Sequence, residues 1–298
     1  MSKHVVLAGG SGFLGGHLTL RLKANGYDVK LLSRQSGHEY FWDGRTEGPW
    51  MRALEGAEAV INLSGAPIAT RWVAGYRKEI AASRVESTQA IGRAIRQCEI
   101  PPKVWVNASA VGYYGDAGDR VLDESAPQGT DFLAKVCGLW EKSVFDVQTS
   151  HTRKHVIRIG FVLGADGGAL PTLAKMTKFF LGGRVGKGRQ WVPWVHVADL
   201  TRMFEWVIQT DDAPAILNAS APTPVTNAHL MQSIRQVLHR PWAPPAPGFA
   251  LVAANAITRF PTELALAGQR AIPKAALAAG FTFEHTQFEA TLADLLRS

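Results

Sequence analysis

Short apolar runs alternate with segments of helical periodicity through the first 220 residues of the chain. Runs such as HVVLA at 4–8 are typical of buried strands, whereas Leu14, Leu18 and Leu22 recur at the spacing of one helix face. Repeated strand–helix alternation favours right-handed crossovers, so we expect an α/β fold with a Rossmann-type, doubly wound parallel sheet. The predicted strands are 4–8, 28–33, 59–64, 104–109, 155–163, 194–197 and 216–220, and the predicted helices are 13–25, 76–97, 132–148 and 199–209.

The pattern changes after residue 220, where prolines become dense and strand-like runs nearly vanish. We therefore predict a cofactor-binding domain over residues 1–220 and a small, mainly helical C-terminal lobe over 221–298. The segment 166–193 is expected to contribute to a substrate cleft between them. Short helices are predicted in the lobe at 226–239, 249–258, 263–267, 273–279 and 287–297.

Composition narrows the class of protein. With 46% hydrophobic and 19% charged residues, the 298-residue chain is too apolar to be disordered and long enough to bury a core. Its two cysteines, Cys98 and Cys137, form no CxxC pair and fit a reducing compartment, and no metal-ligand cluster is expected. The net charge of +7 comes from scattered basic residues, which predicts no nucleic-acid partner. Without a signal-peptide pattern or an apolar run of about 20 residues, the sequence predicts a cytoplasmic protein with no membrane partner.

A glycine-rich turn follows the first predicted strand directly. Gly9, Gly12 and Gly15 form a G-x-x-G-x-x-G pattern that opens the first helix, with Phe13 and Leu14 between the last two glycines. In such a turn, glycines permit the tight bend, the approach of a pyrophosphate to the backbone and the close packing of helix on strand. The phosphates would then meet free amides and the positive end of the helix dipole. This context predicts a dinucleotide-binding site.

The end of the second predicted strand indicates which dinucleotide is bound. A site that prefers NAD usually has Asp or Glu at this place, where the carboxylate accepts hydrogen bonds from the ribose. This chain instead has Ser33 followed by Arg34. A guanidinium suits a 2′-phosphate, so we predict NADP(H) as the cofactor.

Motifs along nearly the whole chain resemble the extended short-chain dehydrogenase/reductases, the superfamily of NAD-dependent epimerases and dehydratases. They include GGSGFLG, LLSR, AVINLSGAPI, RKEIAASRVEST, ASAVGYYGD, RIGFVLGADGGAL and GKGRQWVPWVHVADL. The chain is most similar to an atypical "epimerase family" branch with a C-terminal domain of unknown function, sometimes described as cell-division inhibitors. The resemblance implies adenosine-side contacts from Leu63, Ser64 and Gly65, and nicotinamide-end contacts from Gly160 and Val162. It also implies cofactor contacts from Arg84 of the long helix and from Ser109. Glu79 of the same helix would either bond a ribose hydroxyl of the cofactor or brace Arg84.

The superfamily's catalytic pair, a Tyr with a Lys four residues later, is missing. None of the five tyrosines has a Lys at that spacing, and the two positions fall on Leu133 and Cys137 when the helix is anchored on Glu141. Lys135 would point elsewhere on the helix. The remaining candidates for catalysis are Ser109, at the end of its strand, and Tyr113 and Tyr114 in the loop that follows.

Two functions stay open at this point. One is an NADP(H)-dependent oxidoreductase or isomerase acting on an unknown small molecule; the other is a non-catalytic NADP(H)-responsive module that regulates a partner, such as a division protein. The segment 182–194 favours the first, because its glycines, Lys187, Arg189, Trp191 and Trp194 have the makeup of a substrate pocket. The alternative for this segment is that its tryptophans join the two lobes.

Overall fold

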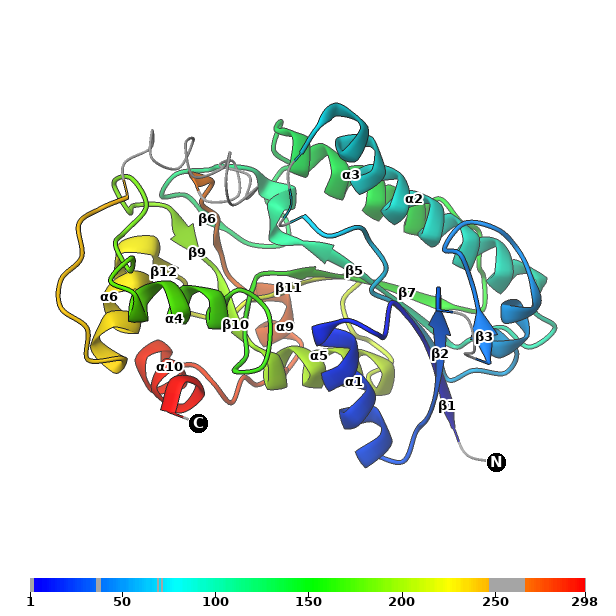
Figure 1. Ribbon diagram of the computed structural model, residues 1–298. Helices are drawn as coiled ribbons and strands as arrows, with labels where there is room; N and C mark the ends of the chain where they lie inside the picture. Colours follow the sequence, from blue (N-terminus) through cyan, green and yellow to red (C-terminus); the bar gives the residue numbers. More distant parts are fainter. Residues whose placement is uncertain (1–2, 36–38, 69, 71, 247–265, 298) are drawn as a thin grey trace.

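A seven-stranded parallel sheet forms the centre of the molecule, with strand order β11-β7-β5-β4-β1-β2-β3 (Figure 1). The computed structural model describes residues 3–35, 39–68, 70, 72–246 and 266–297. The predicted α/β class and doubly wound sheet are confirmed. The strands are β1 (His4–Ala8), β2 (Asp28–Ser33), β3 (Tyr40–Phe41), β4 (Ala59–Asn62), β5 (Val104–Ala110), β7 (Arg153–Ile159) and β11 (Ile216–Ala219).

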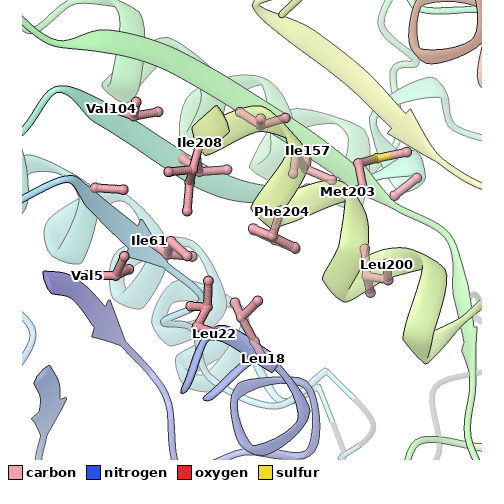
Figure 2. Packing of buried hydrophobic residues seen from close by; sticks show 14 of the residues in the cluster. Val5, Leu18, Leu22, Ile61, Val104, Ile157, Leu200, Met203, Phe204 and Ile208 are labelled. Carbon is pink, nitrogen blue, oxygen red and sulfur yellow. The ribbon is translucent and has the colours of Figure 1, made fainter. Parts of the chain in front are cut away.

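Helices cover both faces of this sheet, and strand alternation decides which side chains each helix meets. Val5 and Leu7 of β1 point to the face covered by α1 (Phe13–Ala24) and α5 (Val197–Gln209), and Figure 2 shows Leu18, Leu22, Met203 and Phe204 packed there. Val6 and Ala8 point to the other face. That face is covered by α2 (Ala74–Gln97) together with the short helix η1 (Pro49–Leu54), and α3 (Phe132–Phe145) packs beside α2. Burial on both faces explains why the strands are continuous apolar runs.

The predicted strand 155–163 is wrong as a single element. The chain leaves the main sheet at Gly160, so that β7 ends at Ile159 and β8 (Phe161–Leu163) pairs with β10 (Trp194–His196) instead. A Cβ on Gly160 would lie 2.2 Å from the Pro193 carbonyl oxygen and 3.1 Å from that of Ala219. Two backbones approach so closely here that only glycine fits, and an apolar pattern does not reveal such a branch point.

The smaller lobe draws its core from both sides of residue 220. Trp194, Leu163 and Leu170 pack against Leu230 and Phe288, which come much later in the chain. The predicted C-terminal helices are confirmed as α6 (Asn227–Val237), α9 (Lys274–Ala278) and α10 (Phe288–Arg297), whereas 249–258 and most of 263–267 lie outside the described residues. Helix α4 (Leu170–Lys178) was not predicted. The remaining short elements are η2 (Val111–Tyr114), β6 (Val121–Leu122), β9 (Trp191–Val192), β12 (Val225–Thr226) and β13 (Arg270–Ala271).

In the described ranges, none of the helices has the length and apolar character that crossing a bilayer requires.

Candidate functional site

The glycine turn after β1 has the backbone geometry of a phosphate-binding loop. Gly9 has φ +78°, and a Cβ there would lie 2.9 Å from the Leu63 carbonyl carbon at the end of β4. A Cβ on Gly15 would lie 2.5 Å from the Cα of Gly10, so α1 packs directly on the turn. Two of the three glycines are thus required by backbone contacts, while Gly12 has open space around its Cα. That open space is where a ligand can approach the backbone.

The N-terminus of α1 offers unpaired donors at this turn. Gly12 is the N-cap residue, and no side chain in the described part of the chain caps the helix; its first turn contains no acidic residue. The amides of Phe13 and Leu14 therefore face outward at the positive end of the helix dipole. This arrangement fits the pyrophosphate of a dinucleotide.

Phe13 joins the glycine turn to a second turn from the smaller lobe. Cβ atoms on Gly164 and Gly167 would lie 2.4 and 2.3 Å from the Phe13 ring, so both residues must be glycine for the ring to fit. His17 and Asp166 reinforce the junction with an Nε2–Oδ1 distance of 3.0 Å. The sequence placed Phe13 at the cofactor, and the structure adds a contact that brings residues 164–168 over the start of α1.

The side chains at the end of β2 leave a basic group exposed. Ser33 is buried, and its Oγ accepts a hydrogen bond from the amide of Gln35 at 3.1 Å. Arg34 is exposed, and among the described residues nothing forms a hydrogen bond or ion pair with its guanidinium. The region thus presents a cation beside the turn, as a 2′-phosphate would require.

Arg84 of α2 lies against the loop that follows β4. Its Nη1 donates to the Ala66 carbonyl at 3.1 Å and to the Ile80 carbonyl at 2.9 Å, and a Cβ on Gly65 would lie 3.0 Å from its Cζ. The guanidinium also stacks over Trp140, with Cζ 5.1 Å from the ring centroid. Burial lowers the pKa of Arg84, and no carboxylate of the described chain pairs with it. Arg84 is thus a half-buried cation that has no counter-ion among the described residues.

Glu79 lies in a different arrangement from the one proposed for it. Its two carboxylate oxygens accept hydrogen bonds from Nη2 of Arg45, at 3.0 and 2.8 Å, and Arg45 also forms an ion pair with Glu86. Glu79 therefore does not brace Arg84, which was one of its two expected roles. No local pattern in the sequence indicates Arg45 as the partner of Glu79, because it lies 34 residues away in the irregular segment after β3.

The face of α3 that should carry the Tyr and Lys confirms the register derived from the sequence. Leu133 and Cys137 both lie next to Gly112, whereas Lys135 is exposed on another side of the helix. Burial raises the pKa of the Cys137 thiol to about 12, and the neighbouring Glu141 adds to this, while Arg84 opposes it. The thiol is therefore neutral at physiological pH and does not replace a lysine ammonium.

Two of the three hydroxyl candidates belong to a buried polar network. Ser109 donates to Glu141 at 2.7 Å, and Arg158 forms two hydrogen bonds to the same carboxylate, at 2.9 and 2.7 Å. Arg158 also donates to the Tyr114 hydroxyl, which in turn donates to the side chain of Asn218 at 2.8 Å. Burial raises the pKa of Tyr114 to about 12, although Arg158 opposes the shift. Both hydroxyls are thus committed to structural hydrogen bonds.

Tyr113 differs from these two residues. Its ring is half-buried, and the Arg158 guanidinium lies over it with Cζ 3.5 Å from the centroid. No hydrogen bond of its hydroxyl is found in the described part of the chain, so the phenol is available to a ligand. Of the three residues proposed for catalysis from the sequence, Tyr113 is therefore the one whose hydroxyl remains available.

The segment 182–194, which the sequence indicates as part of a substrate pocket, has side chains in several different environments. Trp194 is fully buried, donates to the Thr223 carbonyl and packs against Phe288, so the prediction that it lines a pocket is wrong. Trp191 is half-buried beneath Arg270 and donates to Asp119 at 2.8 Å, which joins the two lobes. Lys187 and Arg189 are exposed.

Gly160 and Val162 lie at the branch between β7 and β8, where packing alone accounts for the glycine.

His196 and Asp199 form a helix-capping arrangement at the start of α5. His196 Nδ1 accepts from the Ala198 amide at the start of α5, and its ring stacks on His285 at 3.7 Å between centroids. The buried Asp199 carboxylate accepts hydrogen bonds from Arg202 and from the amides of Glu284 and His285. These residues hold the C-terminal segment against α5.

Family models match most of the chain. The model of the NAD dependent epimerase/dehydratase family matches residues 5–220, and a domain of unknown function, DUF1731, matches residues 246–295. Among curated proteins, an epimerase family protein SDR39U1 homolog from Arabidopsis thaliana is 36% identical over 94% of this chain and 83% of its own length. Epimerase family protein YfhF of Bacillus subtilis is 34% identical over 98% of both chains.

Solved structures agree with these matches. A crystal structure of human epimerase family protein SDR39U1 with NADPH superposes with a TM-score of 0.89, at 32% identity over 99% of both chains. A structure described as a nucleoside-diphosphate sugar epimerase from Corynebacterium glutamicum has a TM-score of 0.82 at 30% identity, with 99% of this chain and 58% of that chain covered.

Proposed function

This chain belongs to the NAD-dependent epimerase/dehydratase family, and from that premise we propose that it binds NADP(H) at the carboxyl edge of its main sheet. The observation that carries the proposal is the glycine turn, where Gly9 and Gly15 are sterically required and the N-terminus of α1 has no side-chain cap. The relative SDR39U1, crystallised with NADPH, supports the choice of dinucleotide.

Two cations would set the preference for the phosphorylated dinucleotide. Arg34, exposed at the end of β2, stands where an acid would select the unphosphorylated ribose. Arg84, held by the carbonyls of Ala66 and Ile80, presents a second positive charge beside the loop after β4. Gly65 permits this approach, because a side chain there would contact the guanidinium.

We propose further that the protein is an oxidoreductase- or epimerase-like enzyme acting on an unknown small molecule without the usual Tyr–Lys pair. Bound NADP(H) would supply or accept a hydride. The matching proton transfer would fall to Tyr113, whose hydroxyl is uncommitted within the described residues and whose ring lies under the Arg158 guanidinium.

A non-catalytic, NADP(H)-responsive module is the second candidate, and one observation favours it. Leu133 and Cys137 replace the acid–base pair with an alkyl group and a thiol that is neutral at physiological pH. In this case the cofactor would change the affinity for a partner, such as a division protein, instead of taking part in turnover.

Two measurements, made one after the other, test these proposals. Calorimetric titration should give tighter binding of NADPH than of NADH; equal affinities would contradict the NADP(H) assignment. A panel of carbonyl compounds and nucleotide sugars should then show turnover that Tyr113→Phe abolishes while NADPH binding persists. Turnover unchanged in Tyr113→Phe would exclude Tyr113 as the proton donor, and absence of turnover on the whole panel would favour the binding module.

A further inference from the structure

A basic hollow lies on the smaller lobe, and it shares no residue with the dinucleotide site. Its volume is about 440 Å³, within the range of small-molecule pockets. It is lined by one face of α6, by Arg184 in the loop after α4 and by the segment after α6. Figure 1 shows where α4 and α6 lie in the smaller lobe. The polar and aromatic side chains that line it are Arg184, Gln232, Arg235, Gln236, Arg240 and Trp242.

Among the described residues, the three arginines of this hollow have no acidic partners. No carboxylate lines it, and none of Arg184, Arg235 or Arg240 forms an ion pair with another described residue. Backbone carbonyls hold two of them in place: Arg184 donates to the Lys187 carbonyl at 2.7 Å, and Arg235 donates to that of Gly182. Each guanidinium has five N–H donors, so most of them remain free. Three like charges around one hollow repel one another, and an anion bound between them would remove that repulsion.

Backbone strain is concentrated beside the same hollow. Within the described part of the chain, the non-glycine residues with positive φ are Phe180, at +63°, and His239, at +51°. Each follows the C-cap of a helix, α4 or α6, and in each case a backbone bond closes the turn, from Leu181 to Met176 and from Arg240 to Arg235.

Elsewhere the chain uses glycine for this cap. Gly26 follows α1 and Gly280 follows α9, with φ values of +83° and +89°, and the same type of closing bond follows each. Glycine adopts this conformation without steric cost, whereas a bulky side chain costs roughly 1 kcal/mol. The helices α4 and α6 thus end on Phe180 and His239 without glycine, and strained positions of this kind cluster at ligand sites.

The two strained residues are linked to the arginines. The Arg240 guanidinium lies over the Phe180 ring, with Cζ 5.4 Å from the centroid, and His239 directly precedes Arg240. The two helix ends thus meet at Arg240, which contacts the residue of one cap and follows the residue of the other. Next to it, Trp242 leaves 74% of its side-chain surface exposed, although a single large aromatic of this kind is usually buried.

From these observations we propose that the hollow is a second ligand site, which binds a nucleoside phosphate. The arginines would hold the phosphate groups, since a guanidinium matches their geometry in a bidentate manner. Trp242 offers a flat face on which a base stacks. The amides of Gln232 and Gln236, which lie one helical turn apart on α6, can both donate to and accept from the edge of that base.

Calorimetric titration with ADP and with inorganic pyrophosphate tests the proposal. One equivalent of NADPH is added first, so that ADP bound at the glycine turn would be displaced and ADP in the hollow would not. We expect saturable ADP binding that is at least tenfold weaker in Arg240→Gln. Arg297→Gln removes the same charge from an exposed site on α10 and is the matched control, with wild-type affinity expected. Absence of ADP binding, or equal loss in both variants, would overturn the proposal.

The Trp242→Ala variant distinguishes recognition of the nucleoside from recognition of its phosphates. We expect this variant to bind ADP about tenfold more weakly, the scale of one base–aromatic stack, and pyrophosphate as the wild type does. If ADP and pyrophosphate bind equally in both proteins, the site recognises phosphate alone and the nucleoside assignment is wrong. NADPH titrations of each variant report on the dinucleotide site separately. Loss of ADP binding in the hollow can therefore be distinguished from loss of NADPH binding at the glycine turn.

Discussion

Ser109 and Glu141 share a hydrogen bond of 2.7 Å in the buried region between β5 and α3. In ordinary relatives the serine at this strand end is expected to face the substrate, but here its proton points to a carboxylate that also binds Arg158. Ser109 is thus part of a buried hydrogen-bond network with Glu141 and Arg158. The same change affects the two positions on α3, where Leu133 and Cys137 replace the pair that would have worked with it.

Breaking the buried ion pair should be costly. Arg158 and Glu141 have side-chain exposures of 2% and 7%, and Arg158→Leu would leave the carboxylate buried without its counter-ion. We expect the free energy of unfolding to fall by about 3–5 kcal/mol, measured by denaturant titration. The double variant Arg158→Leu/Glu141→Leu should recover part of this loss. A single variant as stable as the wild type would show that the pair does not hold the network together.

Arg34→Ala should weaken NADPH binding and leave NADH binding unchanged. Loss of a charge-assisted hydrogen bond to the 2′-phosphate corresponds to about 1.5–3 kcal/mol in binding free energy. Calorimetric titration with both dinucleotides measures it. An equal loss for NADPH and NADH would indicate a general effect on the site, and no loss would place the 2′-phosphate elsewhere.

Two adjacent glycines of α1 provide a matched pair of variants. A Cβ on Gly15 would lie 2.5 Å from the Gly10 backbone, whereas one on Gly16 meets nothing within 4 Å. Gly15→Ala should therefore displace the turn and abolish measurable NADPH binding. Gly16→Ala should retain binding and raise stability by about 0.5–1 kcal/mol, since alanine favours a helix. Equal behaviour of the two variants in titration and thermal unfolding would contradict the packing argument.

Cys137 should be chemically inert in the folded protein. Burial raises its pKa to about 12, so the thiolate needed for alkylation is scarce at pH 8. Labelling with iodoacetamide followed by mass spectrometry should leave Cys137 unmodified until the protein is unfolded. Cys137→Ala should retain NADPH affinity and any turnover. A loss of turnover without a loss of stability would assign the thiol a chemical role.

Acid should destabilise the protein through His196. Burial lowers the pKa of His196 to about 4, with a further contribution from His285, while Asp199 and Asp294 oppose the shift. The unfolded chain binds this proton near pH 6.5 and the folded protein does not, so stability is complete above that pH and decreases as the pH falls towards 4. The loss should reach about 2–3 kcal/mol.

His196→Asn is the control for this effect. Asn retains an acceptor for the Ala198 amide at the start of α5 and has no titratable group. The difference in stability between pH 7.5 and pH 4.5 should be smaller in the variant than in the wild type. The same pH dependence in both proteins would assign the acid sensitivity to other groups.

Local patterns in the sequence predicted the sheet and the glycine turn, because strand burial and a tight bend depend on neighbouring residues. The helix register was predictable for the same reason: placing Leu133 and Cys137 on the inner face and Lys135 outside requires only helix geometry. Contacts between distant segments were not predictable. The branch at Gly160 depends on Pro193 and Ala219, and the partner of Glu79 is an arginine in an irregular segment. Trp194 was misassigned because a Gly- and Trp-rich composition is common to pockets and to cores.

The packing of α1 against α5 has a consequence for the newly synthesised chain. Leu18 and Leu22 leave the ribosome 182 residues before Leu200 and Phe204, which cover them. The Arg21–Glu205 ion pair that joins the two helices spans a similar interval. Until α5 is synthesised, one apolar face of the nascent sheet is exposed to solvent and can associate with other chains. Synthesis of residues 1–196 alone should therefore give an aggregation-prone fragment.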